Sequence, residues 1–414
     1  MKELQQNQRA HVVKFGGVLM GSAENIHHSA KYVASQPKDM GMLTVVSAAS
    51  GITDHLLQIA DSVGEDGIDQ TKRLTDLFYD RQSELVTSLR LSRKGEEQIR
   101  QELYTAYQNI LIYAGISNLH PALRDSILSQ GERISATVFT STLLESGIPV
   151  KKIEAERVIV TNSNFSNASP DVHTSSERIR QIVGPRLQYG QHVVLPGFYG
   201  ADSNSYTTVM PRNSSDLTAA IGAFALNAAE LRLAKGIAGV YDKNPHEHDD
   251  AVYQEWLSYE DAIMISNNGG KVVYPDVMHL MRAKSIPIVV FDPRNPEQET
   301  IISELDPDER EYLRNKRIIF EVWGKGSSAE DLRELLGNIP GVMVSPSKFT
   351  HVANRLKAEE GIEPPDVRAK IRGFVRAEAG HDLHMGIFTS GVGGLFVNFF
   401  DPENQDNNRL TKHV

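Results

Sequence analysis

The sequence predicts an α/β fold built on a mainly parallel sheet, followed by a smaller α+β domain. Two continuous apolar runs, 42–46 (MLTVV) and 193–198 (VVLPGF), are typical of strands that are buried on both faces of a parallel sheet. Residues 47–51 (SAASG) lead from the first run into an apolar helix pattern around Leu56. A strand, a loop of small residues and a helix in this order place ligand sites at the carboxyl ends of the strands.

Further patterns extend this fold as far as residue 305. Strands are expected at 10–15 and 286–291, and helices from Gly17 to about Gln36, over 67–114 and over 214–225. The segment 303–316 is charged, contains Asp306-Pro307 and lacks a clear period, which indicates a domain boundary. We therefore expect a flexible N-terminus at 1–10, a first domain at 11–305, a linker at 306–316 and a second domain at 317–414.

The second domain begins with a strand, helix and strand pattern. Strands are predicted at 317–323 and 341–344, and Ser328 with Asp331 forms a capping box for a helix that ends at Leu336. The glycine-rich run 390–394 (SGVGG) has β-like apolar sequence on both sides. It therefore predicts a hairpin turn rather than a dinucleotide-binding loop.

The composition excludes several classes of protein. The chain has 414 residues with 43 basic and 53 acidic side chains, a formal net charge of -10, which argues against broad binding to nucleic acid or anionic membranes. It contains no cysteine, so disulfides, thiolate zinc sites and a cysteine nucleophile are excluded. Residues 1–11 lack the apolar core of a signal peptide, and no apolar run is long enough to span a bilayer. We expect a cytoplasmic protein that acts on a small molecule.

Two lysines stand beside paired glycines. Lys14 precedes Gly16 and Gly17 at the end of the first predicted strand, where backbone amides can approach an anion closely and the lysine can reach phosphate oxygens. A strand that ends in two glycines also occurs in proteins that bind no phosphate. Lys271, after Gly269 and Gly270, repeats the pattern and would add a second positive charge on a transferred phosphate.

Two charged residues near helix starts suit an amino-acid substrate. Glu132 in 131–135 (GERIS) is interpreted either as a clamp for a substrate ammonium group or as a charge that favours the helix dipole. Arg212 precedes a helix of small residues, where free amides and the planar guanidinium suit a carboxylate. Ser214 or Ser215 is equally suited to be a plain N-cap of that helix.

Taken in order, these segments resemble the aspartokinases. The resemblance covers roughly residues 10–305 and rests on 12–17 (VVKFGG), 45–57 (VVSAASGITDHLL), 125–136 (DSILSQGERISA), 211–219, 239–241 (GVY) with Asn244-Pro245, and 270–275. It implies the three-layer amino-acid-kinase fold, followed by an ACT-like regulatory or assembly domain at 317–414. It further implies that ATP phosphorylates the side-chain carboxylate of L-aspartate to give 4-phospho-L-aspartate, in a homo-oligomer, namely a dimer.

The resemblance also assigns roles to individual positions. Nucleotide binding falls to Lys14, Gly16, Gly17, Ser47, Tyr241 and Lys271. Acceptor binding falls to Thr53, Glu132, Arg212, Ser215 and Asp216. Catalysis falls to Lys14, Asp216 and Lys271. Mg²⁺ would be held mainly by phosphate oxygens, and no dedicated metal site is expected, because 246–250 (HEHDD) lacks a metal-ligand spacing.

The sequence departs from the family at the nucleotide side. Val18 and Leu19 replace the usual Thr-Ser, Lys235 and Gly236 replace the usual Thr-Asp, and 211–216 (PRNSSD) replaces a glycine-rich loop. His246 replaces an arginine. Two alternatives therefore stay open: a kinase for another amino acid or small carboxylate in a specialised pathway, and a non-catalytic sensor of amino acid or nucleotide.

Overall fold

The computed structural model of this protein describes residues 10–36, 41–64, 67–116, 118–212, 214–243, 248, 250–267 and 273–304, together with six strands beyond residue 318. The chain divides into two units. The first consists of Met1–Glu255, Glu260–Met281 and Ile286–Ile302, and the second of Trp256–Tyr259, Arg282–Ser285 and Ser303–Val414. The predicted linker, 306–316, lies outside the described residues.

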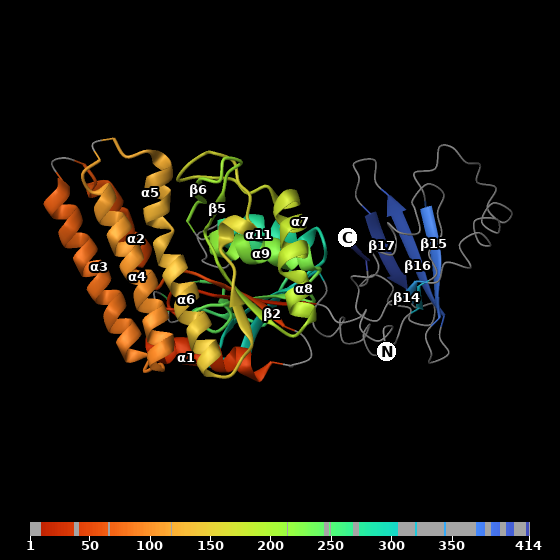
Figure 1. The fold of residues 1–414 in the computed structure, drawn as a ribbon. Coiled ribbons are helices and arrows are strands. Elements are labelled where there is room, and N and C mark those ends of the chain that lie inside the picture. The colour runs from red at the N-terminus through yellow and green to blue at the C-terminus, as the bar shows by residue number, and fades with distance from the viewer. Residues whose placement is uncertain are drawn as a thin grey trace. The chain divides into compact units, whose positions relative to one another are not determined.

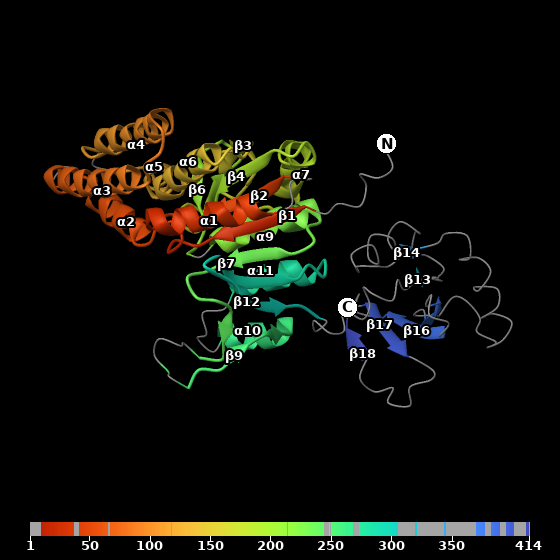
Figure 2. The ribbon, with the colours of Figure 1, turned by 90° about the horizontal axis from the view of Figure 1, so that it is seen from below.

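A mainly parallel sheet forms the centre of the first unit. Its strands lie in the order β12-β11-β7-β1-β2-β4-β3. Figure 2 labels all of these strands except β11. Their bounds are β1 His11–Phe15, β2 Met42–Val46, β3 Val150–Lys152, β4 His192–Pro196, β7 Leu231–Ala234, β11 Ile288–Asp292 and β12 Asn295–Ile302. All neighbouring pairs in this order are parallel except β11 and β12, which are antiparallel.

The apolar runs in the sequence become the buried strands of this sheet. Every residue of β2, β4 and β11 is buried. In β1 the register pairs Lys14 with Val45 of β2 and with Leu233 of β7, so this lysine lies inside the sheet rather than at its rim. The predicted strands at 10–15, 42–46, 193–198 and 286–291, and their parallel arrangement, are confirmed to within a few residues.

Helices cover both faces of the sheet and give three layers (Figure 1). On one face, α6 (Gln130–Glu145) packs against β2, β3 and β4, and α1 (Ala23–Ser35) packs against α6. The side chain of Phe15 in β1 points toward this layer of helices, because its ring centroid lies 5.3 Å from that of Phe139 in α6. On the other face, α9 (Ser214–Leu226) packs against β1, β2 and β7. A Cβ on Gly222 of α9 would lie 4.0 Å from Val12 Cγ1, so Val12 and, by alternation along the strand, Lys14 point toward α9.

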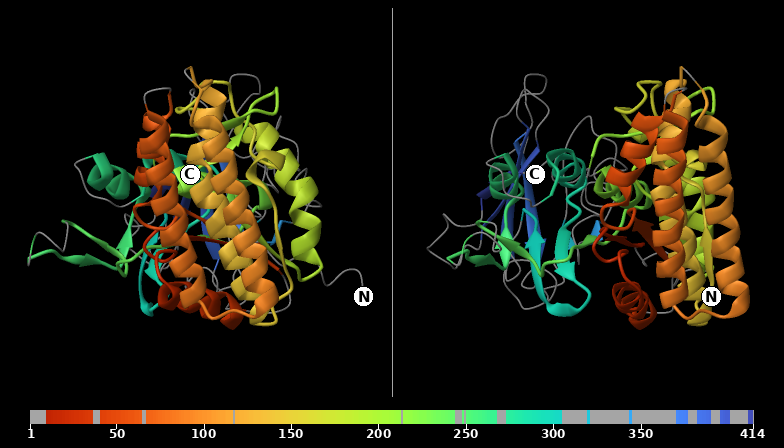
Figure 3. Two further views of the ribbon diagram at one scale, coloured as in Figure 1. Left: turned by 60° about the vertical axis from the view of Figure 1, so that its left-hand side comes forward. Right: turned by 90° about the vertical axis from the view of Figure 1, so that its left-hand side faces the viewer.

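The region 67–114, predicted as one helical stretch, is two helices packed side by side (Figure 3). α3 (Ile68–Ser88) ends before Arg90, whose φ is +52°, and α4 (Arg93–Tyr113) begins after the N-cap Ser92. The remaining helices of the chain's described ranges are α2 Ile52–Ser62, α5 Pro121–Leu128, α7 Val172–Ile182, α8 Gly184–Gln188, α10 Tyr259–Asn267 and α11 Pro275–Arg282, with a 3-10 turn, η2, at Ala155–Arg157. Two small antiparallel pairs complete the unit: β5 (Tyr199–Ala201) with β6 (Thr207–Val209), and β8 (Val240–Tyr241) with β9 (Tyr253–Gln254).

The second unit contains β10 (Trp256–Leu257) and a six-stranded sheet in the order β14-β13-β15-β16-β17-β18. The strands are β13 Ile319–Phe320, β14 Met343–Val344, β15 Lys370–Arg376, β16 Asp382–Thr389, β17 Leu395–Phe400 and β18 Thr411–His413. β16 and β17 are antiparallel, which agrees with the predicted hairpin around 390–394. The predicted helix at 328–336 lies outside the described residues, so the ACT-like module stays a prediction. Within the described ranges, no helix has the length and apolar character that crossing a bilayer requires.

Candidate active site at the carboxyl edge of the sheet

The loops that follow the parallel strands lie side by side at the carboxyl edge of the sheet. The backbone N–H of Gly16, directly after β1, donates to the carbonyl of Ala234 at the end of β7 (3.1 Å). On the other side of β1, Ser47 N–H donates to Phe15 O (3.2 Å). The backbone N–H of Gly197, directly after β4, donates to the carbonyl of Val46 at the end of β2 (2.9 Å). The segments that follow β1, β2, β4 and β7 therefore lie next to one another.

Two glycines in these loops allow backbone to touch backbone. A Cβ on Gly17 would lie 2.7 Å from the carbonyl oxygen of Ala48, and a Cβ on Gly197 would lie 2.6 Å from Cβ of Ser215. Both distances are shorter than van der Waals contact, so a larger residue at either position would displace a neighbouring loop. The close approach fixes the spacing between the loop after β1, the loop after β2 and the first turn of α9.

A carboxylate with a lysine on each oxygen forms the charged centre of the site. Asp216, in the first turn of α9, has its Oδ1 2.5 Å from Nζ of Lys14 and its Oδ2 2.5 Å from Nζ of Lys235. The side chains of Lys14 and Asp216 are 8% and 3% exposed, and that of Lys235, which follows β7, is 29% exposed. We refer to these three residues as the lysine–aspartate cluster.

Burial and charge act against each other in this cluster. Burial alone would raise the pKa of Asp216, but the two ammonium groups outweigh it and hold the pKa well below its ordinary value. For Lys14, burial lowers the pKa, Asp216 opposes this effect, and the nearby charge of Lys235 adds to the lowering. Asp216 is therefore ionised at neutral pH and holds both lysines in place.

Glu132 supplies a second acidic group close to Lys14. It lies in the first turn of α6 and is 3% exposed, and the backbone N–H of Ala48 donates to its carboxyl group. Burial raises the pKa of Glu132 to about 8, although the Ala48 amide and the charge of Lys14 both favour the ionised form. Among the described residues, its Oε2 has no hydrogen-bond partner. A buried carboxyl group with a free oxygen is suited to receive a cationic ligand group. Its place in the first turn of α6 also agrees with the alternative interpretation, a charge that favours the helix dipole.

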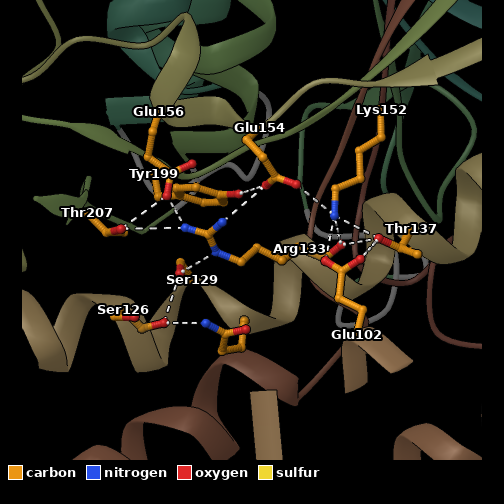
Figure 4. A network of polar contacts seen from close by, with 11 residues as sticks. Glu102, Ser126, Ser129, Arg133, Thr137, Lys152, Glu154, Glu156, Tyr199 and Thr207 are labelled. Atoms are coloured by element: carbon orange, nitrogen blue, oxygen red, sulfur yellow. Dashed lines mark hydrogen bonds and ion pairs between the residues drawn. The ribbon is translucent and has the colours of Figure 1, made fainter. Parts of the chain in front are cut away.

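A polar network fixes the first turn of α6 (Figure 4). The guanidinium of Arg133 lies 4.6 Å from the ring centroid of Tyr199 in β5 and donates to Glu154 (3.1 Å) and to Glu156. Its Nε also donates to Ser129 Oγ (3.1 Å). Because these partners come from β5, from the segment after β3 and from the N-cap of α6, the residue next to Glu132 is tied to two other parts of the fold.

A second buried carboxylate fixes the strand that leads to Arg212. Asp125 of α5 accepts hydrogen bonds from Val209 N–H at the end of β6 (2.8 Å), and from the backbone N–H (2.9 Å) and hydroxyl (2.8 Å) of Ser166. Burial raises the pKa of Asp125, and these donors offset part of the rise. The path of residues 209–212 is thus set by a residue of another helix.

Arg212 lies at the exposed side of the site. Its guanidinium forms an ion pair with Asp54, and the two side chains are 67% and 60% exposed. Asp54 follows Thr53 in the first turn of α2. Arg212 thus pairs with the residue next to Thr53, an aspartate that the sequence analysis did not single out.

The two departures from the family on the nucleotide side are in contact with each other. A Cβ on Gly236 would lie 2.9 Å from Cγ1 of Val18, so the absence of a side chain at 236 makes room for the valine. Asn25 Nδ2 donates to Val18 O (3.0 Å), and Arg294 Nη2 donates to Gly236 O (3.0 Å). Arg294 is itself held by Asp292. The loops after β1 and β7 are therefore joined by side chains on their outer side.

The remaining predicted positions divide into three groups. Ser215 is buried beside Gly197, and Ser47 follows β2 at the same edge. Tyr241 lies in β8, and its hydroxyl accepts a hydrogen bond from Gln298 Nε2 (3.2 Å). Lys271 lies outside the described residues, as does most of 246–250. Sequence reasoning recorded Lys235 as a departure and did not assign it a partner. The strand that precedes it, β7, was not predicted either.

The fold and this site define a kinase class. The chain belongs to the amino acid kinase family, whose sequence profile matches residues 10–292.

Aspartokinases are similar to this chain in sequence. It is 29% identical to the lysine-sensitive aspartokinase 3 of Escherichia coli over 287 residues, which cover 69% of this chain and 62% of that enzyme. It is 26% identical to the aspartokinase of Chlamydia trachomatis over 298 residues, covering 72% of this chain and 64% of the relative. The chain thus spans less than two thirds of the length of these relatives.

A solved structure shows the same fold. The crystal structure of E. coli aspartokinase III in complex with lysine and aspartate matches with a TM-score of 0.64 and 21% identity, covering 93% of this chain and 89% of the other. The predicted α/β amino-acid-kinase fold is therefore confirmed.

Proposed function

We propose that this protein transfers the γ-phosphoryl group of ATP to the side-chain carboxylate of L-aspartate, giving 4-phospho-L-aspartate and ADP. The observation that carries the proposal is the lysine–aspartate cluster at the carboxyl edge of an amino-acid-kinase sheet, with Glu132 beside it and Arg212 at its exposed side. A crystal structure of E. coli aspartokinase III contains aspartate and ADP, which supports the same pair of ligands here.

In this reaction a carboxylate oxygen of aspartate forms a bond to the γ-phosphorus, and the bond from the γ-phosphorus to the β–γ bridging oxygen breaks. The bridging oxygen keeps the electron pair and leaves on ADP. The acceptor has a pKa near ~4 and is already ionised at neutral pH, so no general base is required. The task of the protein is to bring two anions together, and positive groups such as Lys14 do so electrostatically.

The acceptor would be recognised through both of its other charged groups. Glu132, buried and with one oxygen unpartnered, is suited to the ammonium group. The planar guanidinium of Arg212 can form two parallel hydrogen bonds to the α-carboxylate of the substrate, which would replace Asp54 as its partner. Thr53 and Ser215 would line the same side.

The nucleotide would lie over the loops after β1 and β7. Gly16 and Gly17 would offer backbone contacts and Ser47 its hydroxyl group, with Tyr241 further out. Lys271 is included among the nucleotide-binding residues on its sequence motif alone. The described residues contain no cluster of three or more His, Asp or Glu side chains suited to a metal ion. We therefore place Mg²⁺ on the phosphate oxygens, where it would neutralise charge on the transferred group.

The test is formation of an acyl hydroxamate from hydroxylamine, ATP and Mg²⁺ with a panel of amino acids and small dicarboxylates. Aspartate-dependent hydroxamate together with equimolar ADP supports the proposal. Turnover of a different acid would identify a kinase with another acceptor. Binding of aspartate or nucleotide without any turnover across the panel would identify a sensor.

We also propose that residues 317–414 serve assembly of a homodimer. The support is the six-stranded sheet, in which β15 to β18 form an antiparallel meander. Light scattering on the full chain tests this, and a monomer at micromolar concentration would contradict it.

A further inference from the structure

Lys235 stands where the nucleotide phosphates of the proposed function would lie. It follows Ala234, the last residue of β7, whose carbonyl accepts the Gly16 amide. Its own backbone N–H donates to Phe291 O of β11 (2.8 Å). The main chain of Lys235 is thus fixed by strands on both sides, and its Nζ reaches Asp216 Oδ2 at 2.5 Å.

The lysine–aspartate cluster carries more positive than negative charge. Asp216 already has Lys14 on Oδ1, so the pair is neutral before Lys235 is counted. Within the described ranges, no other carboxylate forms an ion pair with either lysine. Glu132 is the nearest further acid that affects Lys14, and with a pKa of about 8 it is largely uncharged at pH 7. One positive charge of the cluster is therefore left without a counter-charge.

The surplus cation is costly to the folded protein unless it binds an anion. A partly buried charge without a counter-charge destabilises the native state. Lys235 is the most exposed member of the cluster, at 29%, whereas Lys14 is 8% exposed. An incoming anion therefore reaches Lys235 without dismantling the buried Lys14–Asp216 pair.

The neighbouring groups define what kind of anion fits. Gly16 N–H is hydrogen-bonded to the carbonyl of Ala234, the residue directly before Lys235, so the Gly16-Gly17 turn lies beside this lysine. The first turn of α9, which carries Asp216, lies at the same edge of the sheet. Backbone amides of such a turn and the start of a helix both favour phosphate oxygens. A polyphosphate carries several negative charges, so it can neutralise the one positive charge of the cluster that has no counter-charge.

We propose that Lys235 is a further phosphate-binding cation, which contacts a phosphate oxygen of the nucleotide while Asp216 holds the ammonium groups of Lys235 and Lys14 on its two oxygens. This inference rests on the proposed function for the identity of the nucleotide. It assigns a binding role to the residue that replaces the family's threonine.

The variants separate charge from shape. Lys235→Met removes the charge and keeps the length of the side chain, Lys235→Arg keeps the charge, and Lys235→Thr installs the residue usual in the family. Lys94→Met, on the exposed surface of α4, removes one positive charge elsewhere and serves as the matched control. Calorimetry with Mg·ADP, inorganic tripolyphosphate and adenosine measures binding without turnover, and thermal unfolding measures stability.

We expect Lys235→Met to bind Mg·ADP and tripolyphosphate about tenfold or more weakly, with adenosine unchanged, because a charge-assisted contact to phosphate is lost. Lys235→Arg should stay within about threefold of the wild type, since Arg keeps the charge. Stability should be equal or higher in Lys235→Met, because the surplus charge is gone. If Lys235 were a structural ion-pair partner, this variant would instead unfold at a lower temperature and bind the phosphates unchanged.

The outcomes distinguish this inference from the proposed function. Phosphate binding by Lys235→Met within about twofold of the wild type, in a folded protein that still phosphorylates aspartate, overturns the role of Lys235 alone. Lys235-dependent Mg·ADP binding in a wild type that turns over no acceptor overturns the proposed function alone. If Lys235→Met does not fold, Lys235→Thr takes its place, and failure of both to fold while Lys235→Arg folds contradicts the inference in favour of the structural role.

Discussion

The proposed phosphate side and the proposed acceptor side of the site hold their charges in different ways. On the phosphate side, Lys14 and Asp216 are paired inside the protein at 2.5 Å, with side chains 8% and 3% exposed. On the acceptor side, Arg212 and Asp54 are paired at the surface, and their side chains are 67% and 60% exposed. A buried pair is fixed before any ligand arrives, whereas an exposed pair is screened by solvent and easily exchanged. Under the proposed function, the phosphate side is thus preorganised for charge stabilisation, and Arg212 on the acceptor side can exchange Asp54 for a substrate carboxylate.

The largest effect is expected on the buried side. Lys14→Ala should lower kcat by about 10²–10³, because it removes a preorganised charge from the transferred group. It also leaves Asp216 with a single lysine. Steady-state kinetics with both substrates measures the loss, and circular dichroism checks the fold. Kinetic constants within about threefold of the wild type would remove Lys14 from the mechanism.

Glu132 should couple stability to pH. Its carboxyl ionises near 4.5 in the unfolded chain and at about 8 in the folded protein, so between these values the folded state holds a proton that the unfolded state has lost. The wild type should therefore lose stability relative to Glu132→Gln as the pH rises from about 4.5 to about 8, by about a few kcal/mol in total.

Urea unfolding across this pH range measures the difference. Glu97→Gln, on the surface of α4, is the control and should give no such trend. Parallel pH dependence in the wild type and Glu132→Gln would show that Glu132 is ionised in the folded protein at neutral pH. Glu132→Gln should also raise KM for the acceptor, since Gln cannot ionise when the substrate ammonium group binds beside it.

The exposed side should respond in binding rather than in turnover. Arg212→Lys is expected to raise KM for aspartate by about tenfold and to leave KM for ATP nearly unchanged, because lysine cannot form two parallel bonds to a carboxylate. Arg93→Lys, in another exposed ion pair, should change neither constant. Equal losses for both substrates in Arg212→Lys would place this arginine on the nucleotide side and reverse the comparison.

The smallest effect concerns the contact between Val18 and Gly236. Gly236→Ala should destabilise the protein by about 1 kcal/mol or less, because the new Cβ falls 2.9 Å from Val18 Cγ1. Val18→Ala should relieve most of this penalty. A double-mutant cycle from thermal unfolding measures the coupling, and strictly additive effects would show that the two departures are independent.

The local patterns predicted four strands of the central sheet, missed β3, β7 and β12, and did not predict the charged contacts. Buried parallel strands such as β2 are continuous apolar runs, and a glycine pair after Lys14 is visible in the chain itself. The partner of Lys235 depends on β7 lying beside β1 and on α9 packing against both, which no local pattern encodes. Arg212 and Asp54 are 158 residues apart in the chain.

The break between α3 and α4 escaped prediction for a different reason. Residues 89–92 (LRLS) contain neither glycine nor proline, so no strong helix breaker marks the turn. Ser92 caps the second helix, but a single serine is a common residue within helical sequence as well. The helical character of the region was predictable, and its division into two helices was not.

The contacts at Gly17 and Gly197 also bear on how such a site can be altered. Where main chain presses against main chain, any added side chain must move a whole loop, so these positions can hardly contribute to new chemistry. Variation is left to side chains that are at least partly exposed in this and neighbouring loops, such as those at 18, 212 and 235. A library meant to change the acceptor or the phosphate donor should therefore randomise the projecting positions and keep the glycine frame, so that each library member inherits the same backbone.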